Sequence, residues 1–476
     1  MSNIKEYFQS NKYGKYLYNN IFNIDTFHLN KNLITYLRYL ITTMISIVIF
    51  RSATIVDTIF TGQFISTTGL AAIALIAPID LFCVAVNQCL TSGSLVVIGD
   101  YLGQRNYGKA DALYTKTCIT VLVISLFLSL ILFIFAKPLI FALGGNEEIL
   151  KDSLIYLRIY AIFLTFRSFE HVLSAFVRLV GRTSIPPMFS FINTIINFSL
   201  KYIFVIKMNM GMYGIILSTS FALFIVSLMY LYCLLSDKEK RLNFTMLMGS
   251  FKEILYIAYN GISSFAMLIS TAVFTIFMNK MVTLYLGNDG LAALAPISMI
   301  AYINDTIIAV FTTSMVPLIS ISYGQRYFHN VKLFLQYALI GSLIFGGLFF
   351  ILSSVSPSTI VNLFLDKNIT SENVVKLAIF GLSLVKYEFI AVIFTVVLNE
   401  FLTAIQRPAE SLILSILSAI AIPVPFMLVM SKLFGSWGLF SSFSIAGIIS
   451  ATITILVVYF GRKKYLSYHG VAKMRF

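Results

Sequence analysis

Long apolar blocks alternate with short polar segments along nearly the whole chain. Most blocks reach about twenty residues, the length that a helix needs to cross a hydrocarbon core about 30 Å thick. Lipid offers the backbone no hydrogen-bond partners, and the blocks show little of the strict alternation of barrel strands, so helices are predicted. Read in order, the blocks predict about twelve transmembrane spans, at residues 34–60, 70–98, 117–142, 153–177, 185–206, 213–235, 254–285, 291–322, 333–355, 374–401, 409–432 and 439–460.

The composition agrees with a membrane location. Of the 476 residues, 58% are hydrophobic and only 11% are charged. A water-soluble chain carries about a quarter charged residues, so charge is too scarce here to cover a water-facing surface. The predicted fold class is therefore an all-α integral membrane protein.

The net charge of +14 comes from residues in the short loops and at the two termini. Membrane topology explains this distribution better than a nucleic-acid surface does, because basic loops mark the cytoplasmic side. We therefore expect a multi-pass protein of the cell membrane with both termini in the cytoplasm and no nucleic-acid partner. The basic side is marked by Arg105, Lys109, Lys116, Arg178, Arg182, Lys238, Lys240, Arg241, Arg326, Lys332, Arg407 and the cluster at 462–464.

Residues 1–32 lack the short apolar core of a cleavable signal peptide, so the first span is expected to remain as a signal anchor.

The cysteines fall inside or beside apolar blocks and form no metal-type pair. They are interpreted as small buried hydrophobes, and no cofactor or resident metal is expected. They are Cys83, Cys89, Cys118 and Cys233.

Short sequences recur at one offset along the chain. Gly69-Leu-Ala-Ala72 returns as Gly290-Leu-Ala-Ala293, and Gly103-Gln-Arg105 returns as Gly324-Gln-Arg326. A further pair, Gly211-Met-Tyr-Gly214 and Gly435-Ser-Trp-Gly438, lies a few residues off that offset. Shared apolar composition would not align two Gly-Gln-Arg ends, so an internal repeat is predicted.

Two copies with six helices each enter the membrane from the same face, so they should be parallel repeats. The predicted organisation is a cytoplasmic N-terminal segment, a first lobe, a cytoplasmic linker, a second lobe and a cytoplasmic tail, at residues 1–33, 34–240, 241–253, 254–460 and 461–476. Two-lobed repeats suit alternating access, which favours a transporter over a channel or receptor. The chain lacks a phosphate-binding GxxxxGK[ST] loop, so an ion gradient would have to drive it.

Several motifs resemble those of one transporter family. Asp57-Thr-Ile-Phe-Thr-Gly62 and the segment 69–78 resemble the first two helices of MATE (multidrug and toxic compound extrusion) transporters. Val316-Pro-Leu-Ile-Ser-Ile-Ser-Tyr-Gly324 is similar to the eighth-helix ending of the bacterial multidrug branch, and Thr403-Ala-Ile-Gln-Arg-Pro408, Pro423 and the segment 435–438 to its tenth and eleventh helices. The resemblance implies export of cationic amphipathic compounds in exchange for protons or sodium ions.

Asp57 is the strongest candidate for a coupling residue. It lies in the outer part of the first span, where an ionised carboxylate is costly unless it is paired or hydrated. Desolvation would let it load and release a proton, or with oxygen neighbours it could hold sodium instead. The alternative is a structural ion pair with Arg51, although a separation of six residues places the two on different faces of a helix.

Asn193 and Asn197 lie four residues apart in the fifth span, and therefore on one face. They resemble the polar pair that completes a cation site with the first-helix aspartate in some MATE transporters. Some members carry a second acid at the position of Asn197, which leaves the stoichiometry open here. The alternative is interhelical hydrogen bonding. Thr219 in the sixth span could add an oxygen, or its hydroxyl could bond to its own backbone.

The second lobe offers Asp305, Glu388 and Asn279 as candidates for a central substrate cavity. Intramembrane acids rarely face lipid, so either acid could attract a cationic substrate. Asn279 lies one residue off the position that corresponds to Asp57 in the repeat. Because its side chain is neutral, it suggests that ion coupling belongs to the first lobe alone.

Arg167 and Glu170 lie three residues apart in the fourth span, so mutual neutralisation is predicted.

We expect a monomer whose partners are a cationic small molecule, H⁺ or Na⁺, and membrane lipid. The remaining alternatives are a flippase for lipid-linked sugars and a membrane-embedded transferase. The flippase should have a cationic cavity for phosphate groups, whereas the buried charges here are mixed, and a transferase should show clustered metal-binding acids.

Overall fold

The computed structural model describes residues 29–64, 67–145, 147–236, 242–245, 251–364 and 372–465. Every regular element in these ranges is a helix, and the chain divides into two compact units, Met1–Tyr259 and Asn260–Phe476. Most of the predicted N-terminal segment and tail, and part of the predicted linker, lie outside the described residues.

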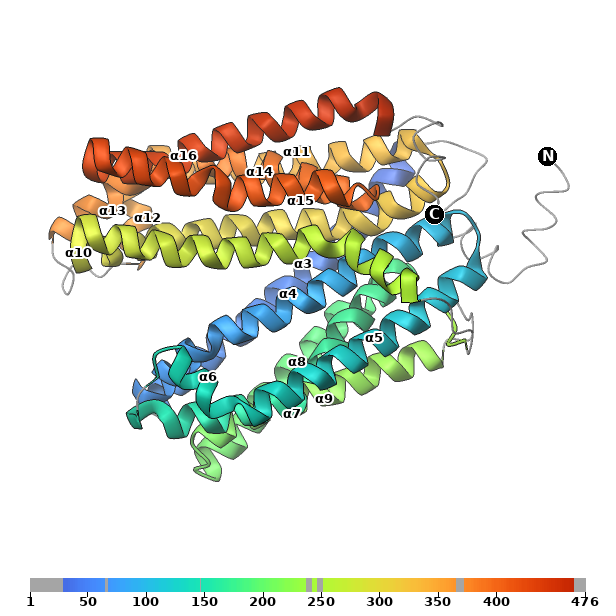
Figure 1. The fold of residues 1–476 in the computed structure, drawn as a ribbon, viewed down its shortest axis with the longest axis horizontal. Helices are drawn as coiled ribbons and strands as arrows, with labels where there is room; N and C mark the ends of the chain where they lie inside the picture. The colour runs from blue at the N-terminus through green and yellow to red at the C-terminus, as the bar shows by residue number, and fades with distance from the viewer. Residues whose placement is uncertain are drawn as a thin grey trace, which may run out of the picture. The chain divides into compact units, whose positions relative to one another are not determined.

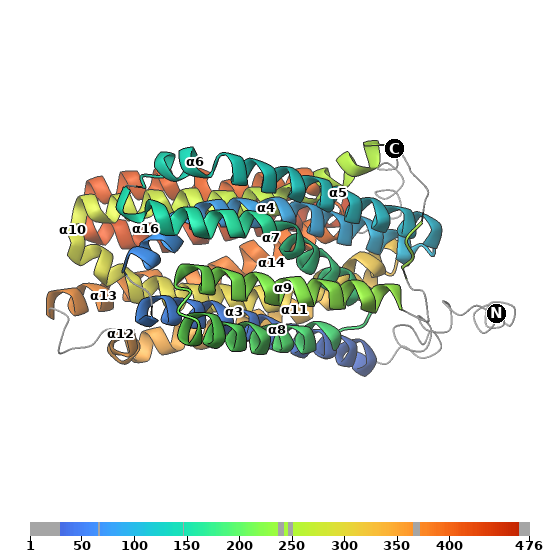
Figure 2. The same ribbon diagram turned by 90° about the horizontal axis from the view of Figure 1, so that it is seen from below.

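In the first unit, α7 packs against α4, α5 and α9, while α8 packs against α3 and α9 (Figures 1 and 2). Its core joins apolar side chains of α4, α5, α6 and α7, among them Ile76, Leu132 and Leu157. The helices are α3 (Leu29–Phe64), α4 (Thr67–Gly103), α5 (Tyr107–Ile134), α6 (Ala136–Ala142), α7 (Glu147–Leu179), α8 (Ile185–Lys201), the π-helix η1 (Tyr202–Lys207) and α9 (Met212–Leu235).

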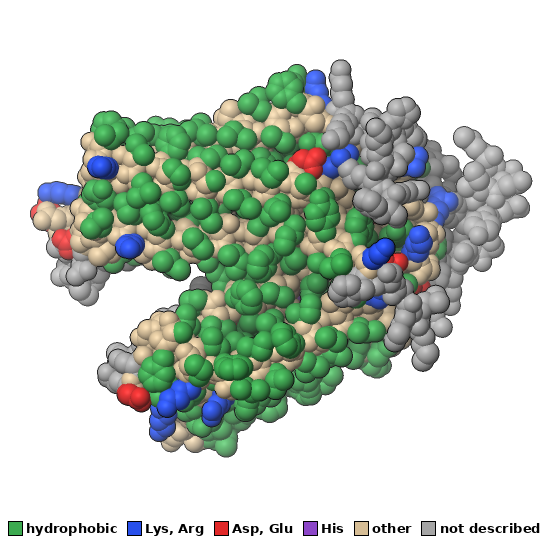
Figure 3. All heavy atoms as spheres, viewed as in Figure 1, with side chains coloured by type: hydrophobic (Ala, Val, Ile, Leu, Met, Phe, Trp, Pro, Cys, Tyr) green, Lys and Arg blue, Asp and Glu red, His purple; other side chains and the backbone are tan. Residues whose placement is uncertain are grey.

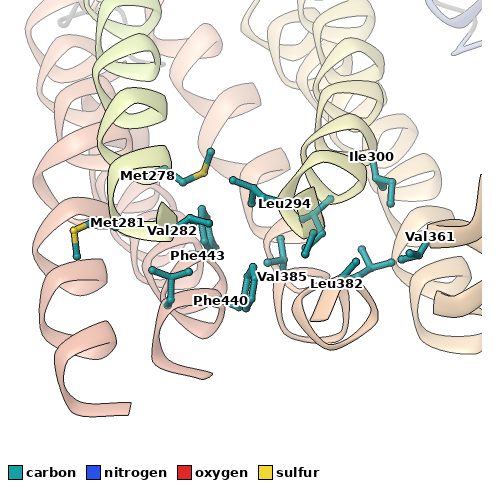
Figure 4. Packing of buried hydrophobic residues seen from close by; sticks show 14 of the residues in the cluster. Met278, Met281, Val282, Leu294, Ile300, Val361, Leu382, Val385, Phe440 and Phe443 are labelled. Atoms are coloured by element: carbon teal, nitrogen blue, oxygen red, sulfur yellow. The ribbon is translucent and has the colours of Figure 1, made fainter. Parts of the chain in front are cut away.

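In the second unit, α14 packs against α11, α15 and α16. Figure 4 shows its core, where Val282 and Leu294, from the two halves of α10, meet Val385 and Phe440. The helices are α10 (Phe251–Gly324), which begins in the first unit, α11 (Phe328–Val355), α12 (Pro357–Phe364), α13 (Glu372–Val385), α14 (Glu388–Ala404), α15 (Pro408–Ile416), the π-helix η2 (Leu417–Ala421) and α16 (Pro423–Tyr465).

The predicted all-α membrane fold is confirmed. Nine described helical stretches are long and apolar enough to cross a membrane, or ten if α13 and α14, which meet at 48°, form one bent span. Non-helical backbone at Gly287 and Gly435 divides α10 and α16 into two helices each. Together with α7, which is long enough to cross a membrane but carries more charged residues, the described helices match the twelve predicted spans.

Two predicted spans were wrong in detail. The third, at 117–142, is two helices, because α5 ends at Ile134 and the short α6 starts at Ala136. Pro138 then lies in the first turn of α6, where a missing backbone N–H breaks no hydrogen bond. The tenth, at 374–401, is interrupted at Lys386 and Tyr387, between α13 and α14.

The repeated Gly-Gln-Arg segments form the same turn in both units. Arg105 has φ 63° and Arg326 has φ 64°, a left-handed conformation that is uncommon for any residue but glycine. In both turns the arginine N–H donates to the carbonyl three residues back, and the next N–H donates to the carbonyl five residues back. This pattern closes the helix end in a Schellman-type cap. The sequence repeat is therefore also a repeat of backbone structure.

Hydrophobic side chains remain on the outer sides of the helices. On the face that Figure 3 shows, they cover the helices of each unit, and the Lys and Arg side chains lie near the helix ends. On α5, for example, Leu126, Phe127, Leu130 and Ile134 are all more than half exposed. An apolar surface this extensive suits contact with lipid rather than water.

Candidate functional site

Asp57 lies in α3, seven residues before the helix ends at Phe64. Its side chain and that of Arg51 fall outside the described residues, so neither the coupling role nor the ion pair is tested. The helix itself packs against α8, which carries the predicted site residues Asn193 and Asn197.

Asn193, Asn197 and Lys201 follow one another at intervals of four residues on the buried face of α8. The exposed fractions of the three residues are 7%, 4% and 0%. The Nζ atom of Lys201 donates a hydrogen bond to Oδ1 of Asn197 at 2.8 Å. An ammonium group in a hydrophobic interior needs such oxygen partners, because burial removes its hydration.

Thr219 joins this group from α9. Its hydroxyl lies 3.4 Å from Oδ1 of Asn197 and 3.3 Å from the carbonyl oxygen of Ile215 in its own helix. The expected bond of the hydroxyl to its own backbone is therefore present, and its role as a ligand of a cation stays a prediction. Oδ1 of Asn193 is buried and has no hydrogen-bond partner among the described residues. The structure thus brings Asn197 and Thr219 into contact and leaves an unused oxygen one helical turn away.

Lys201 is a residue that the sequence interpretation missed. A signal was available, because a lysine inside the predicted span 185–206 is an intramembrane charge and such residues mark functional sites by default. The fold shows that it points inward, which only the packing of α8 could establish.

The predicted pairing of Arg167 with Glu170 was wrong. Arg167 forms a two-point ion pair with Asp80 of α4, with Nη1 2.8 Å from Oδ1 and Nη2 3.2 Å from Oδ2. The hydroxyl of Tyr160 also donates to Oδ1 of Asp80 at 2.8 Å. A planar guanidinium matches a carboxylate in this geometry, and the partner on the neighbouring helix is better placed than one in the same helix.

Two further contacts continue this polar row along α4 and α7. Asn87 donates to the hydroxyl of Ser168 at 2.9 Å, and Thr91 lies 3.2 Å from Nδ1 of His171. In a membrane interior these contacts satisfy groups that lipid could not. The row sits at the interface of the two helices and binds them together.

In the second unit, Asp305 and Glu388 lie beside a contact between α10 and α14. Asn304 donates from Nδ2 to the carbonyl oxygen of Phe389 at 3.3 Å. Asp305 follows Asn304 in the sequence and Glu388 precedes Phe389, so each acid adjoins one partner of this hydrogen bond. Asp305 is exposed and Glu388 is partly exposed within the unit. Asn279 is also exposed, on the other half of α10, and none of the contacts among the described residues joins it to either acid.

A hydroxyl network between α14 and α15 also escaped the sequence interpretation. Oδ1 of Asn399 accepts from Ser411 at 2.7 Å, and its Nδ2 donates to Ser415 at 2.6 Å. Thr403 lies 2.8 Å from Ser411 and 3.1 Å from Ser263 of α10. All five side chains are buried. Within the described residues, no group of three or more His, Cys, Asp or Glu side chains could hold a metal ion.

A family model described as MatE matches residues 42–203 and 263–429. The chain is similar to the multidrug export protein MepA of Staphylococcus haemolyticus, at 23% identity over 410 residues, which cover 85% of this chain and 88% of that protein. It is also similar to the probable multidrug resistance protein YoeA of Bacillus subtilis, at 23% identity over 348 residues, covering 70% and 73% of the two chains.

Solved structures show the same fold. A crystal structure of MATE in the bent conformation superposes with a TM-score of 0.85 at 18% identity, covering 92% of this chain and 97% of that chain. The transporter VcmN of Vibrio cholerae superposes with a TM-score of 0.83 at 16% identity, covering 92% and 99%.

Proposed function

The chain belongs to the MatE family, whose members are multi-pass membrane transporters rather than enzymes, and on this premise we propose that it is a secondary antiporter. It exports cationic amphipathic compounds in exchange for protons or sodium ions. The MepA and YoeA relatives carry multidrug names, which supports this class of substrate.

The observation that carries the proposal is the group of side-chain oxygens on α8 and α9. Asn193 and Asn197 are buried, the partly buried hydroxyl of Thr219 adds a third oxygen, and α3 packs against α8. Asp57 is the only acidic residue in the sequences of α3, α8 and α9. A single carboxylate beside neutral oxygens suits the exchange of one coupling cation.

Asp305 and Glu388 supply the complementary charge for the substrate. A charged side chain that is exposed within a membrane span faces a water-filled cavity rather than lipid, since lipid would leave its charge unsolvated. Two neighbouring carboxylates attract a cation, and Asn279 would contribute a neutral contact elsewhere in the cavity. Aromatic side chains add attraction for flat cations through their ring faces.

Coupling requires only that substrate and ion favour opposite states of the two lobes, so the two sites need not touch. We propose lobes at residues 34–240 and 254–460, a cytoplasmic linker at 241–253, cytoplasmic termini and a monomeric transporter. The flippase alternative is less well supported, because Asp80 neutralises Arg167 and leaves no cationic cavity for phosphate groups at this point.

The test is efflux of a fluorescent cationic dye from cells that express the wild type or Asp57→Asn at matched membrane levels. We expect the wild type to expel the dye and the variant to retain it. Equal behaviour of the two proteins across a panel of dyes would contradict the role of Asp57. Exchanging sodium and proton gradients across everted vesicles would then distinguish the coupling ions.

A further inference from the structure

We propose that the ammonium group of Lys201 is a tethered cation that occupies the sodium-binding position of the first unit, so that transport by this chain does not use sodium. The inference rests on the proposed function, because it concerns the coupling site of the same antiporter. It goes further in naming a residue that selects between the two possible coupling ions.

The first argument is the geometry of Lys201. Its side chain is fully buried, and Nζ lies 2.8 Å from Oδ1 of Asn197. An ammonium is a compact point charge with three N–H donors and no acceptor, so it binds to oxygen atoms much as an alkali cation does. The amide oxygen that a sodium ion would need is therefore already used by a positive charge that cannot leave.

The second argument is the set of oxygens around this contact. The hydroxyl oxygen of Thr219 lies 3.4 Å from the same amide oxygen. One turn away, the buried Oδ1 of Asn193 has no hydrogen-bond partner among the described residues. Buried oxygens are normally satisfied, so an unused one beside two others indicates a place prepared for a cation or a donor. Neutral oxygens of this kind are suitable sodium ligands once the ammonium is removed.

The third argument is a comparison with Lys207, which lies further along the same span. Lys207 is exposed, and its Nζ lies 5.9 Å from the centre of the Tyr202 ring. This is the ordinary behaviour of a lysine near a helix end, where the long side chain reaches towards the interface. Lys201 does the opposite and turns its charge inward, so an interfacial anchor does not explain it.

The repulsion between like charges then sets the selectivity. A sodium ion bound to Asn197 would lie close to the ammonium in a medium that screens charge poorly, which opposes its binding. A proton can still exchange on a carboxylate near a fixed cation, since it adds no second ion to the oxygen group. The site is thereby biased towards proton coupling.

The experiment measures binding of radioactive sodium to the purified full-length protein in detergent, for the wild type, Lys201→Met and the matched control Lys207→Met. We expect no saturable sodium binding by the wild type or the control. We expect Lys201→Met to bind at least about tenfold more sodium than the control, a difference that Asn197→Ala should remove in the double variant.

Saturable sodium binding by the wild type that is lost on Asn197→Ala would overturn the proposal, and this measurement does not depend on the lysine variant being folded. A folded Lys201→Met protein that binds no sodium would overturn it as well. Dye export in cells is measured separately. If the wild type exports no dye under any gradient, the proposed function fails. The proposal that Lys201 is a tethered cation is tested by the sodium-binding measurement alone.

Discussion

Arg105 and Arg326 hold the same left-handed backbone conformation, with φ of 63° and 64°, in the turns that end α4 and α10. Two non-glycine residues share a strained conformation at equivalent places of a repeat. The same correspondence holds for Gly211 and Gly435, with φ of 56° and 57°. The repeat therefore includes the backbone conformation of these turns as well as their sequence.

Gly435→Ala should therefore destabilise the protein by about 1–2 kcal/mol, because an L side chain disfavours positive φ. Added atoms would meet nothing within 4 Å at this position, so the loss would come from the backbone alone. Gly108→Ala is the matched control, since its added Cβ also meets nothing within 4 Å and its backbone is helical. It should be neutral or slightly stabilising. Thermal unfolding in detergent measures both, and equal losses would contradict the assignment of strain.

Asp80→Asn should destabilise the first unit by about 1–3 kcal/mol, because it leaves the guanidinium of Arg167 without its charged partner. The control is Glu372→Gln, which removes one partner of an exposed ion pair with Lys376. Such exposed pairs contribute little to stability, so the control should not change the unfolding midpoint measurably. A loss no greater than that of the control would show that the Asp80–Arg167 pair is not structural.

Asn197→Ala should reduce both stability and dye export, because it deprives the buried Lys201 ammonium of its 2.8 Å acceptor. Asn193→Ala removes an amide of similar burial whose oxygen has no partner in the described part of the chain. Its effect on the unfolding midpoint should be smaller. Unfolding and efflux measured on both variants test this order, and a larger stability loss for Asn193→Ala would reverse the assigned roles.

Asp305→Asn and Glu388→Gln should each raise the KM for a cationic dye several-fold, since each removes a negative charge from the proposed cavity. In the double variant the KM should rise by less than the product of the two single increases, because neighbouring charges act on the same ligand. Asp289→Asn, an exposed acid beside the break at Gly287, is the control and should leave the KM unchanged. Export of an uncharged substrate should be unaffected by all of these changes, which excludes a general loss of folding.

Much of the fold could be predicted because lipid imposes a length and a hydropathy on each span. The repeat was also visible, since Gly103-Gln-Arg105 and Gly324-Gln-Arg326 mark equal turns. The breaks between α5 and α6 and between α13 and α14 were not predicted. The end of α5 lies just before Lys137 and Pro138, and the bend between α13 and α14 falls at Lys386 and Tyr387. Polar residues and prolines also occur inside unbroken helices, as Pro78 does in α4, so these residues alone did not locate the breaks.

The candidate site could be predicted only in part. The spacing of Asn193 and Asn197 placed both on one face of α8, because a single helix fixes that relation. The partner of Arg167 could not be found in this way, since Asp80 belongs to another helix and only helix packing brings the two together. The inward direction of Lys201 was hidden for the same reason, and the side chain of Asp57 remains a prediction.

The ion pair of Asp80 and Arg167 has a consequence for where water reaches in the protein. Within their unit the two side chains keep 36% and 30% of their surface accessible, although both belong to membrane-crossing helices. Hydrocarbon would not solvate these charges, so we predict that water reaches the pair through a recess from one side of the membrane. A cysteine placed beside Asp80 should then react with a membrane-impermeant thiol reagent, and protection by bound substrate would map the recess from within.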